Sequence, residues 1–155
     1  MTEDLLIVSS ALVFKRIKRG RSTRRWFIVK QSEDGGWELP RTVARRGESS
    51  VRAVTRMMAD QGGMNIAVLE EAGRSGGISR VNNKVKKQRH LFYLILFKNG
   101  REVLGFEDAV WLEYAEAARK LTNKRDQQML RAANKLVKTV ELPKAEKPED
   151  AELEI

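Results

Sequence analysis

The chain has 155 residues, of which 41% are hydrophobic and 33% are charged, so we expect one folded domain with a buried core and not a disordered chain. It contains no cysteine, which excludes disulfides, thiolate zinc sites and a cysteine nucleophile. No apolar run approaches the ~20 residues that span a bilayer, and Glu3 and Asp4 stand where a signal peptide has basic residues. We therefore expect a cytoplasmic protein that does not bind membranes.

Positive charge is concentrated in the body of the chain. The 30 Lys and Arg outnumber the 21 Asp and Glu, which gives a net charge of +9. The last twelve residues hold two of those bases and five of the acids, so the other 143 residues carry +12. A basic body favours polyanions such as RNA or nucleotide phosphates, although a merely soluble cationic surface has the same composition. We expect a domain over residues 1–140 and a charged, disordered tail over 141–155.

The first part of the chain predicts a strand pair and a short third strand. Apolar and β-branched residues fill 5–17 and 26–30 around a charged turn, which favours a β-hairpin. Asp34-Gly35 predicts a second turn, before a strand at 37–39 that Pro40 ends. A basic loop is then expected to run to Gly47.

A helix is expected to begin at Ser49 or Ser50, since either side chain can cap the free N–H groups, and to end at Gly62-Gly63. Apolar residues recur at helical spacing and are expected to form its buried face: Val51, Val54 and Met58, with Ala53 and Met57 as further candidates.

The second half predicts further strands and then helices. The expected elements are an extended segment at 64–71, a glycine-containing loop at 72–78, a long strand at 80–98, a hairpin turn at Asn99-Gly100 with a return strand at 101–104, a short strand at 110–112, and one or two helices over 113–137 with a cap at Thr122. This order predicts an α/β (α+β) fold, an α/β/α sandwich with a mixed central sheet.

The segment 37–64 resembles the box of the Nudix hydrolase superfamily. That box reads G, five residues, E, seven residues, R-E-U-x-E-E-x-G-U, where U is a bulky aliphatic residue. The matching positions are Glu48, Arg56, Met58, Gly63 and Met64; the departures are Thr42 for the first Gly, Met57 for the Glu after Arg, and Asp60-Gln61 for the paired Glu. The lead-in Trp37-Glu38-Leu39-Pro40-Arg41 is similar to the family's W-x-L-P-K, Gly47-Glu48-Ser49 is similar to its G-E-S helix start, and the resemblance extends over roughly 8–137.

The departures remove acids from the surface that binds metal in active members of the family. Met57, Asp60 and Gln61 are spaced i, i+3, i+4 and are expected to share one helix face. In active members that face holds Mg²⁺, or Mn²⁺ as an alternative, with carboxylates against a diphosphate. Here it offers a thioether, one carboxylate and one amide, whereas Mg²⁺ prefers charged oxygen ligands. The resemblance thus implies a degenerate box.

The resemblance implies roles for individual residues. Glu48, Arg56 and Asp60 would form the catalytic set, in which Arg56 orients Glu48 through an ion pair. Glu48 and Asp60 would hold the metal with help from Gln61. A base could come from a later loop, where the candidates are Glu102, Glu107 and Asp108. In the alternative, Arg56 and Asp60 form an ordinary surface pair, Met57 and Met58 are core, and Glu48 stabilises the helix start.

Basic residues near the box are the candidates for phosphate binding: Arg41, which stands where the family has Lys, with Arg45, Arg46 and Lys87. The alternative is that these cations only solvate hairpin tips or protect strand edges. We assign no role to His90, the only histidine. The leading hypothesis is a Nudix-fold protein that binds a nucleotide, a diphosphate-linked compound or an RNA end, with weak or lost metal-dependent pyrophosphohydrolase activity. The second is a non-catalytic RNA or ribonucleoprotein-binding module. Oligomeric state stays open.

Overall fold

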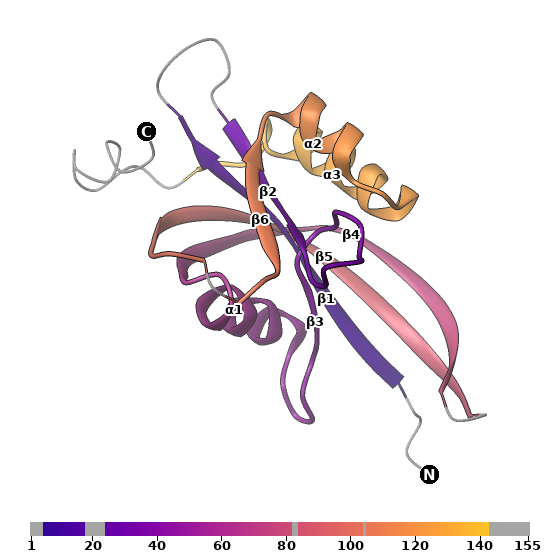
Figure 1. Cartoon of the computed structure of the whole chain (residues 1–155). Helices are drawn as coiled ribbons and strands as arrows, with labels where there is room; N and C mark the ends of the chain where they lie inside the picture. Colours follow the sequence, from indigo (N-terminus) through magenta and orange to yellow (C-terminus); the bar gives the residue numbers. More distant parts are fainter. Residues whose placement is uncertain (1–4, 18–23, 82–83, 104, 143–155) are drawn as a thin grey trace.

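The computed structural model describes residues 5–17, 24–81, 84–103 and 105–142 (Figure 1). Within them the elements are β1 (Leu5–Arg16), β2 (Arg24–Lys30), β3 (Arg41–Val43), α1 (Ser50–Asp60), β4 (Met64–Val81), β5 (Lys84–Gly100), β6 (Asp108–Leu112), α2 (Tyr114–Lys120) and α3 (Lys124–Leu136). The charged turn expected at 18–25 falls largely outside the described residues.

The strands form one mixed sheet in the order β4-β5-β1-β2-β6, with β3 paired to β1. β1 runs parallel to β5 and antiparallel to β2 and β3. Helix α1 covers one face, and α2 and α3 cover the other (Figure 1). The expected mixed sheet, α/β/α layering and β1–β2 hairpin are confirmed.

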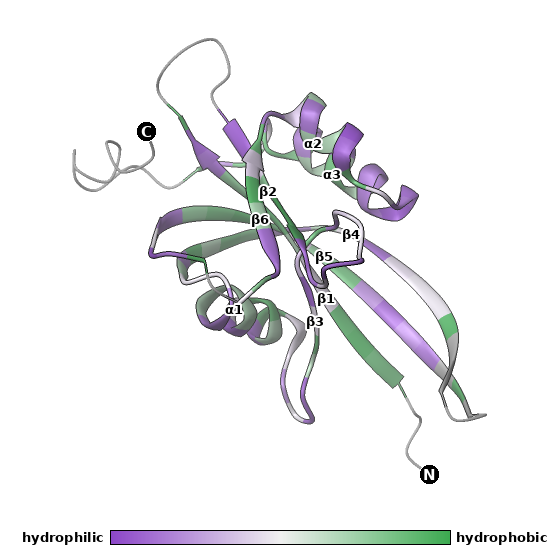
Figure 2. Cartoon of the chain, in the orientation of Figure 1, coloured by the Kyte–Doolittle hydropathy of each residue, from purple (hydrophilic) through white to green (hydrophobic). Residues whose placement is uncertain are grey.

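The two faces of the sheet build two hydrophobic clusters. Along β1, Leu12 and Phe14 pack into the cluster that includes Leu130 of α3, whereas Ala11 and Val13 pack into the cluster of α1. Successive side chains of a strand leave opposite faces, so a strand covered on both sides has to be apolar at every central position. Figure 2 shows this as continuous hydrophobic colour through the middle of the sheet.

Helix α1 begins and ends where its local residues predict. The Ser49 side chain accepts a hydrogen bond from the Arg52 N–H at 3.1 Å, and Gly63 supplies a positive φ of 61° after the last turn. Ala53, Val54, Met57 and Met58 are buried, as expected. Val51 is the exception: it is 41% exposed and lies outside the buried face.

The prediction of a loop at 72–78 is wrong. These residues continue β4, which pairs with β5 up to Val81 opposite Lys84. Gly73 has a packing role and not a turn role: a Cβ there would lie 2.6 Å from Met129 Sδ, so its absence lets α3 approach the sheet. Register shifts between Val68 and Glu70 and between Glu71 and Gly73 accommodate the same stretch.

The hairpin turn expected at Asn99-Gly100 is also wrong. Both residues lie at the end of β5, paired with Asn65 and Met64, and 101–103 form no strand. A Cβ on Gly100 would lie 2.9 Å from the Phe97 ring, so this glycine too serves packing. Leu104 lies outside the described residues.

Smaller differences concern the segment before α1 and the caps. The expected strand at 37–39 forms only isolated bridges, and the expected loop contains the short strand β3. The helical region divides as expected, but the cap of α3 is Asn123, one residue after Thr122. The predicted tail lies outside the described residues from 143 onward, whereas Leu142 still packs against the core. No helix among the described residues is both long and apolar enough to cross a membrane.

Candidate nucleotide site

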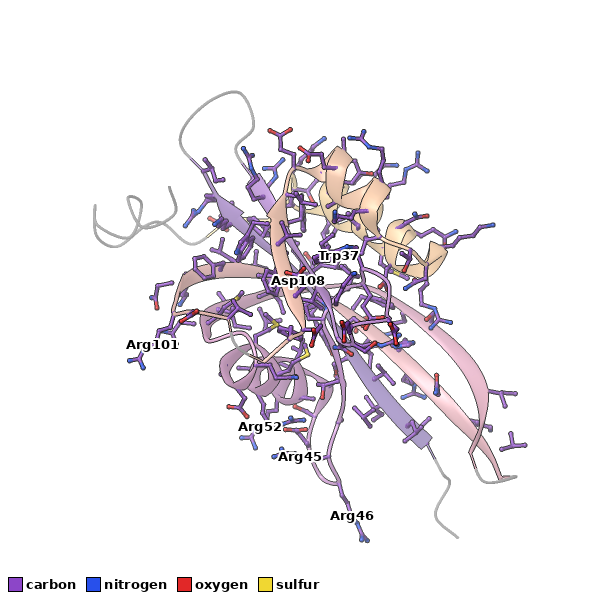
Figure 3. The ribbon with its side chains drawn as sticks, in the orientation of Figure 1. Trp37, Arg45, Arg46, Arg52, Arg101 and Asp108 are labelled. Atoms are coloured by element: carbon purple, nitrogen blue, oxygen red, sulfur yellow. The ribbon has the colours of Figure 1, made fainter. Side chains whose placement is uncertain are left out.

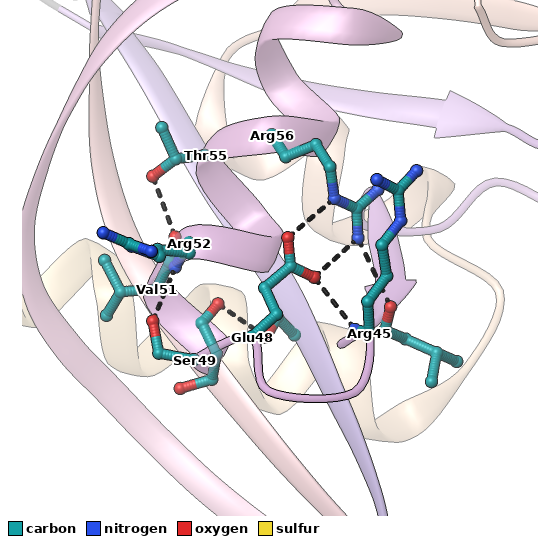
Figure 4. A network of polar contacts seen from close by, with 10 residues as sticks. Arg45, Glu48, Ser49, Val51, Arg52, Thr55 and Arg56 are labelled. Atoms are coloured by element: carbon teal, nitrogen blue, oxygen red, sulfur yellow. Dashed lines mark hydrogen bonds and ion pairs between the residues drawn. The ribbon is translucent and has the colours of Figure 1, made fainter.

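The loop before α1 is organised around Glu48 (Figure 4). Arg56 binds both carboxylate oxygens of Glu48: Nε donates to Oε2 at 2.8 Å, and Nη2 donates to Oε1 at 2.9 Å. The Arg45 backbone N–H donates to Oε1 at 2.9 Å, and Arg56 Nη2 also reaches the Val43 carbonyl at 3.5 Å. One arginine thereby ties the first turns of α1 to the loop and to β3.

The electrostatics of this pair follow from its hydrogen bonds. The bond from Arg56, and after it the bond from the Arg45 N–H, lowers the pKa of Glu48 to about 2. The same contact raises the pKa of Arg56. The ion pair predicted between these two residues is therefore present, while its catalytic use stays a prediction.

The substituted positions 57 and 60 of the box do not share one environment. Met57 is fully buried and packs with Val54, Met58 and Met64 in the cluster between α1 and the sheet. Asp60 is exposed at the end of the helix. The shared face expected from i, i+3, i+4 spacing is thus divided, because the sheet covers position 57 and leaves position 60 in solvent.

A later loop packs against the end of α1 at Gln61. Gly105 N–H donates to the Gln61 carbonyl at 3.0 Å, and Gln61 Nε2 donates to the Gly105 carbonyl at 3.3 Å. A Cβ on Gly105 would lie 2.4 Å from Gln61 Cα, so glycine is required for this approach. The candidate bases Glu107 and Asp108 follow this glycine closely in the chain, the first in the loop and the second at the start of β6 (Figure 3 labels Asp108), and both are exposed.

These donors do not fit a family-type magnesium site. Beside Glu48, Asp60 is a single exposed carboxylate, and Gln61 contributes only a neutral amide, whose Nε2 donates to the Gly105 carbonyl. Within the part of the chain that the structure describes, no three His, Asp or Glu side chains converge as metal ligands would. The metal-binding roles of Glu48, Asp60 and Gln61 therefore stay predictions.

A hollow of about 560 Å³ lies beside the lead-in segment, lined by Val8, Gln31, Arg41, Thr42, Val43, Gln88, His90 and Arg125. Its walls come from β1, β3, β5, the turn after β2 and the start of α3. Gln31 Nε2 donates to the Arg41 carbonyl at 3.2 Å, and the Arg41 guanidinium lies 3.6 Å from Glu38. The lining offers arginines and amides, which suits a polar, anionic ligand.

His90 and Arg125 meet at one wall of this hollow. Arg125 Nη1 lies 2.7 Å from His90 Nδ1. Burial, and then the charges of Arg125 and Arg41, lowers the pKa of His90 to about 4, so the ring is neutral near pH 7. Because arginine can only donate, Nδ1 accepts and the ring proton resides on Nε2. His90, to which no role was assigned from sequence, therefore belongs to the hollow.

Asp126 positions the start of α3 against the lead-in segment. Its Oδ2 accepts from the Leu39 backbone N–H at 2.9 Å and from Asn123 Nδ2 at 3.0 Å, while Asn123 Oδ1 caps the helix by accepting from the Asp126 N–H at 2.7 Å. The side chain is only 5% exposed, and burial raises its pKa. This contact links residues 87 positions apart and places Arg125 over the hollow.

The predicted phosphate-binding residues fall in different places. Arg41 lines the hollow, whereas Arg45 and Arg46 are exposed on the loop before α1, with Arg46 at its tip (Figure 3). Lys87 lines a second hollow of about 550 Å³ on the β4–β5 hairpin, with Arg89 and Ile78 among its neighbours. Sequence reasoning missed Arg125, because it lies in a helix whose local pattern indicates only an exposed charge.

Solved structures resemble this architecture, although no family model matches the sequence and no curated protein is similar to it. A NUDIX hydrolase from Nitrosomonas europaea has a TM-score of 0.65 at 13% identity, covering 84% of this chain and 88% of its own. The Ap4A hydrolase of C. elegans has a TM-score of 0.63 at 12% identity, covering 86% of this chain and 98% of its own. This chain has the Nudix fold. The NUDIX domain of Shewanella oneidensis NrtR, complexed with ADP ribose, has a TM-score of 0.61 at 17% identity over 88% of this chain and 90% of its own.

The Nudix fold expected from the segment 37–64 is thereby confirmed. At identities of this size the likeness concerns the path of the backbone. The substitutions at positions 57, 60 and 61 belong to this chain, and their consequence has to be argued from its own side chains.

Proposed function

We propose that this Nudix-fold protein binds a nucleotide or a diphosphate-linked compound in the hollow beside Arg41. The observation that carries the proposal is the convergence of Arg41, Arg125 and neutral His90 on one concavity of about 560 Å³. Guanidinium groups bind phosphate oxygens with charge-assisted hydrogen bonds, and the Gln31 amide oxygen can accept a hydrogen bond from a base or sugar. The size suits a nucleotide-sized ligand.

The comparisons support this ligand class without assigning it. One similar structure is an Ap4A hydrolase and another is a NUDIX domain complexed with ADP ribose, so related folds act on or bind nucleotides joined through phosphates. The hollow of this chain lies beside the lead-in segment, directly before the residues that resemble the box.

We further propose that metal-dependent pyrophosphohydrolase activity is weak or lost. Met57 is buried and cannot serve as a ligand or base, which leaves Glu48 and exposed Asp60 as the carboxylates among the proposed metal-binding positions. The loss of a positioned general base alone costs roughly 10²–10⁴-fold in rate. If activity survives, it depends on exposed Asp60 and on a carboxylate of the loop at 105–108.

The direct test is to incubate the purified protein with a panel of nucleoside diphosphate derivatives and Mg²⁺ or Mn²⁺, and to measure binding and turnover separately. We expect binding with little or no turnover, and reduced binding in Arg41→Gln. Rapid hydrolysis that Asp60→Ala abolishes would refute the degenerate-enzyme view. Binding that persists unchanged in Arg41→Gln would refute the placement of the ligand.

RNA binding is a second candidate, and the hairpin favours it. Lys87 and Arg89 alternate along β5 with Gln88 and His90, so their side chains leave the face opposite the Arg41 hollow, and both are exposed. Filter binding of a short RNA at increasing salt is the test. A steep loss of affinity with salt, reduced further in Lys87→Gln, is expected if phosphate contacts dominate. Absent or salt-insensitive binding would remove this candidate.

A further inference from the structure

We propose that Arg125 is a phosphate-binding residue of the hollow and that His90 is its positioning residue, so that the preferred ligand carries two linked phosphates. This inference rests on the proposed nucleotide-binding function and deepens it. It assigns the second phosphate to α3, a helix outside the segment that resembles the Nudix box, with Arg41 on β3 holding the first.

The partner of Arg125 distinguishes it from the other arginines with described side-chain contacts. Arg56, Arg74, Arg41 and Arg25 each lie within 4.0 Å of a carboxylate, on Glu48, Glu71, Glu38 and Glu113 respectively. Within the described residues no carboxylate pairs with Arg125, and its guanidinium is held instead by a neutral imidazole. This contact holds the guanidinium in place without neutralising its charge through a direct ion pair, which favours binding of an anion.

The surroundings of His90 hold its ring in a fixed position beside this arginine. The side chain is only 6% exposed, and its ring packs against Phe92 with 5.5 Å between ring centroids. Its Nε2 is buried and has no protein partner within the described residues. A residue that only filled this space would be better apolar, since a buried unpaired polar atom is unfavourable. The contact that accounts for a histidine here is the one that Nδ1 accepts from Arg125.

The second cation completes the site. Arg41 on β3 and Arg125 on α3 line the same hollow, and the charges of both act on His90 and on the carboxylate of Asp126. Asp126 does not neutralise them by a direct pair, because its Oδ2 is bound by the Leu39 N–H and by Asn123. Glu38 lies 3.6 Å from the Arg41 guanidinium and offsets part of its charge, whereas no carboxylate pairs with Arg125 within the described residues, so the lining of the hollow favours an anion. A diphosphate offers one charged group to each.

The experiment compares ADP, AMP and adenosine by calorimetry in EDTA, on the full chain and four variants. Arg125→Gln removes the charge and should weaken the affinity for ADP about 10- to 100-fold, because the loss of a hydrogen bond to a charged group changes affinity by about this factor. The affinity for adenosine, which has no phosphate, should change little. Arg131→Gln is the matched control, since Arg131 is an exposed arginine of the same helix that lines a different hollow. It should leave the affinity for ADP unchanged.

The positioning role of His90 has its own readout. His90→Asn retains an acceptor near the place of Nδ1 and should keep most of the ADP affinity, whereas His90→Phe keeps the bulk, loses the acceptor and should resemble Arg125→Gln. Thermal unfolding of each variant shows that the protein is folded. If His90→Phe does not fold, the comparison of His90→Asn with Arg125→Gln decides.

The outcomes separate the two proposals. If the unsubstituted chain binds no ADP, the proposed function fails and this assignment fails with it. If ADP binds and Arg125→Gln binds it as tightly, or if ADP and AMP bind equally well, the assignment to Arg125 is overturned while nucleotide binding stands. A loss of ADP affinity in Arg125→Gln and His90→Phe, with no change in Arg131→Gln and most of the affinity kept in His90→Asn, establishes it.

Discussion

Arg56 lies in the second turn of α1 and Arg125 in the first turn of α3, and the two arginines bind different kinds of partner. Arg56 on α1 is bound by the carboxylate of Glu48, so both charges are neutralised inside the loop that precedes the helix. Arg125 on α3 is bound by neutral His90, so its charge remains available. The region that resembles a catalytic box thus holds its arginine in an ion pair, whereas the arginine held by a neutral ring lies on the opposite face of the sheet.

The largest expected effect comes from restoring the missing acid in the box. Met57→Glu places a carboxylate at a fully buried position between α1 and the sheet, so we expect the free energy of unfolding to fall by about 3–5 kcal/mol. Ala59→Glu, at an exposed position of the same helix, is the control and should cost far less. Chemical denaturation measures both. A stable Met57→Glu variant that gains hydrolysis would mean that position 57 can face a metal after all.

An intermediate effect is expected at the contact that positions the free arginine. Asp126→Ala removes the acceptor for the Leu39 N–H and for Asn123, so we expect a loss of about 1–3 kcal/mol in the free energy of unfolding, with weaker ADP binding. Glu116→Ala is a suitable control, because Glu116 is an exposed acid on the neighbouring helix α2. Equal affinity for ADP in Asp126→Ala and in the unsubstituted chain would show that the hollow does not depend on this link.

The smallest expected effects concern the dependence of stability on pH. The contacts of His90 and of Glu48 should lose their contributions to stability over different pH ranges. The pKa of His90 is lowered to about 4 in the folded state, so the unfolded chain takes up this proton first and stability falls as pH drops from about 6.5 towards 4. The pKa of Glu48 is lowered to about 2, so its contribution is complete above about 4.5 and is lost as pH falls towards 2.

Matched variants separate these two contributions. Denaturation midpoints measured from pH 7 to 2.5 should fall with pH in the unsubstituted chain. In His90→Asn the fall between about pH 6.5 and 4 should be smaller, and in Glu48→Gln the fall below about pH 4.5 should be smaller. NMR titration of the single histidine gives its pKa directly. A value near 6.5 would contradict the buried contact with Arg125.

Local residue patterns predicted most of the fold. The cap at Ser49, the glycine stop after α1, the strand pair β1–β2 and the division of 113–137 into helices are confirmed, because each depends on residues within a few positions of one another. The glycines of β4 and Gly100 misled for the same reason. Locally they indicate turns, whereas a Cβ on Gly73 would collide with Met129 of α3 and a Cβ on Gly100 would collide with the Phe97 ring.

By itself the sequence determined that this chain forms a mixed sheet between helices, that a Nudix-like segment leads from Trp37 into a capped helix, and that its acids are depleted. Only the tertiary structure decided what surrounds each side chain. Met57 is core because the sheet covers it, and Arg125 and His90 meet although 35 positions separate them. Secondary structure follows from neighbours along the chain, whereas burial and charge at a site depend on residues that only the fold brings together.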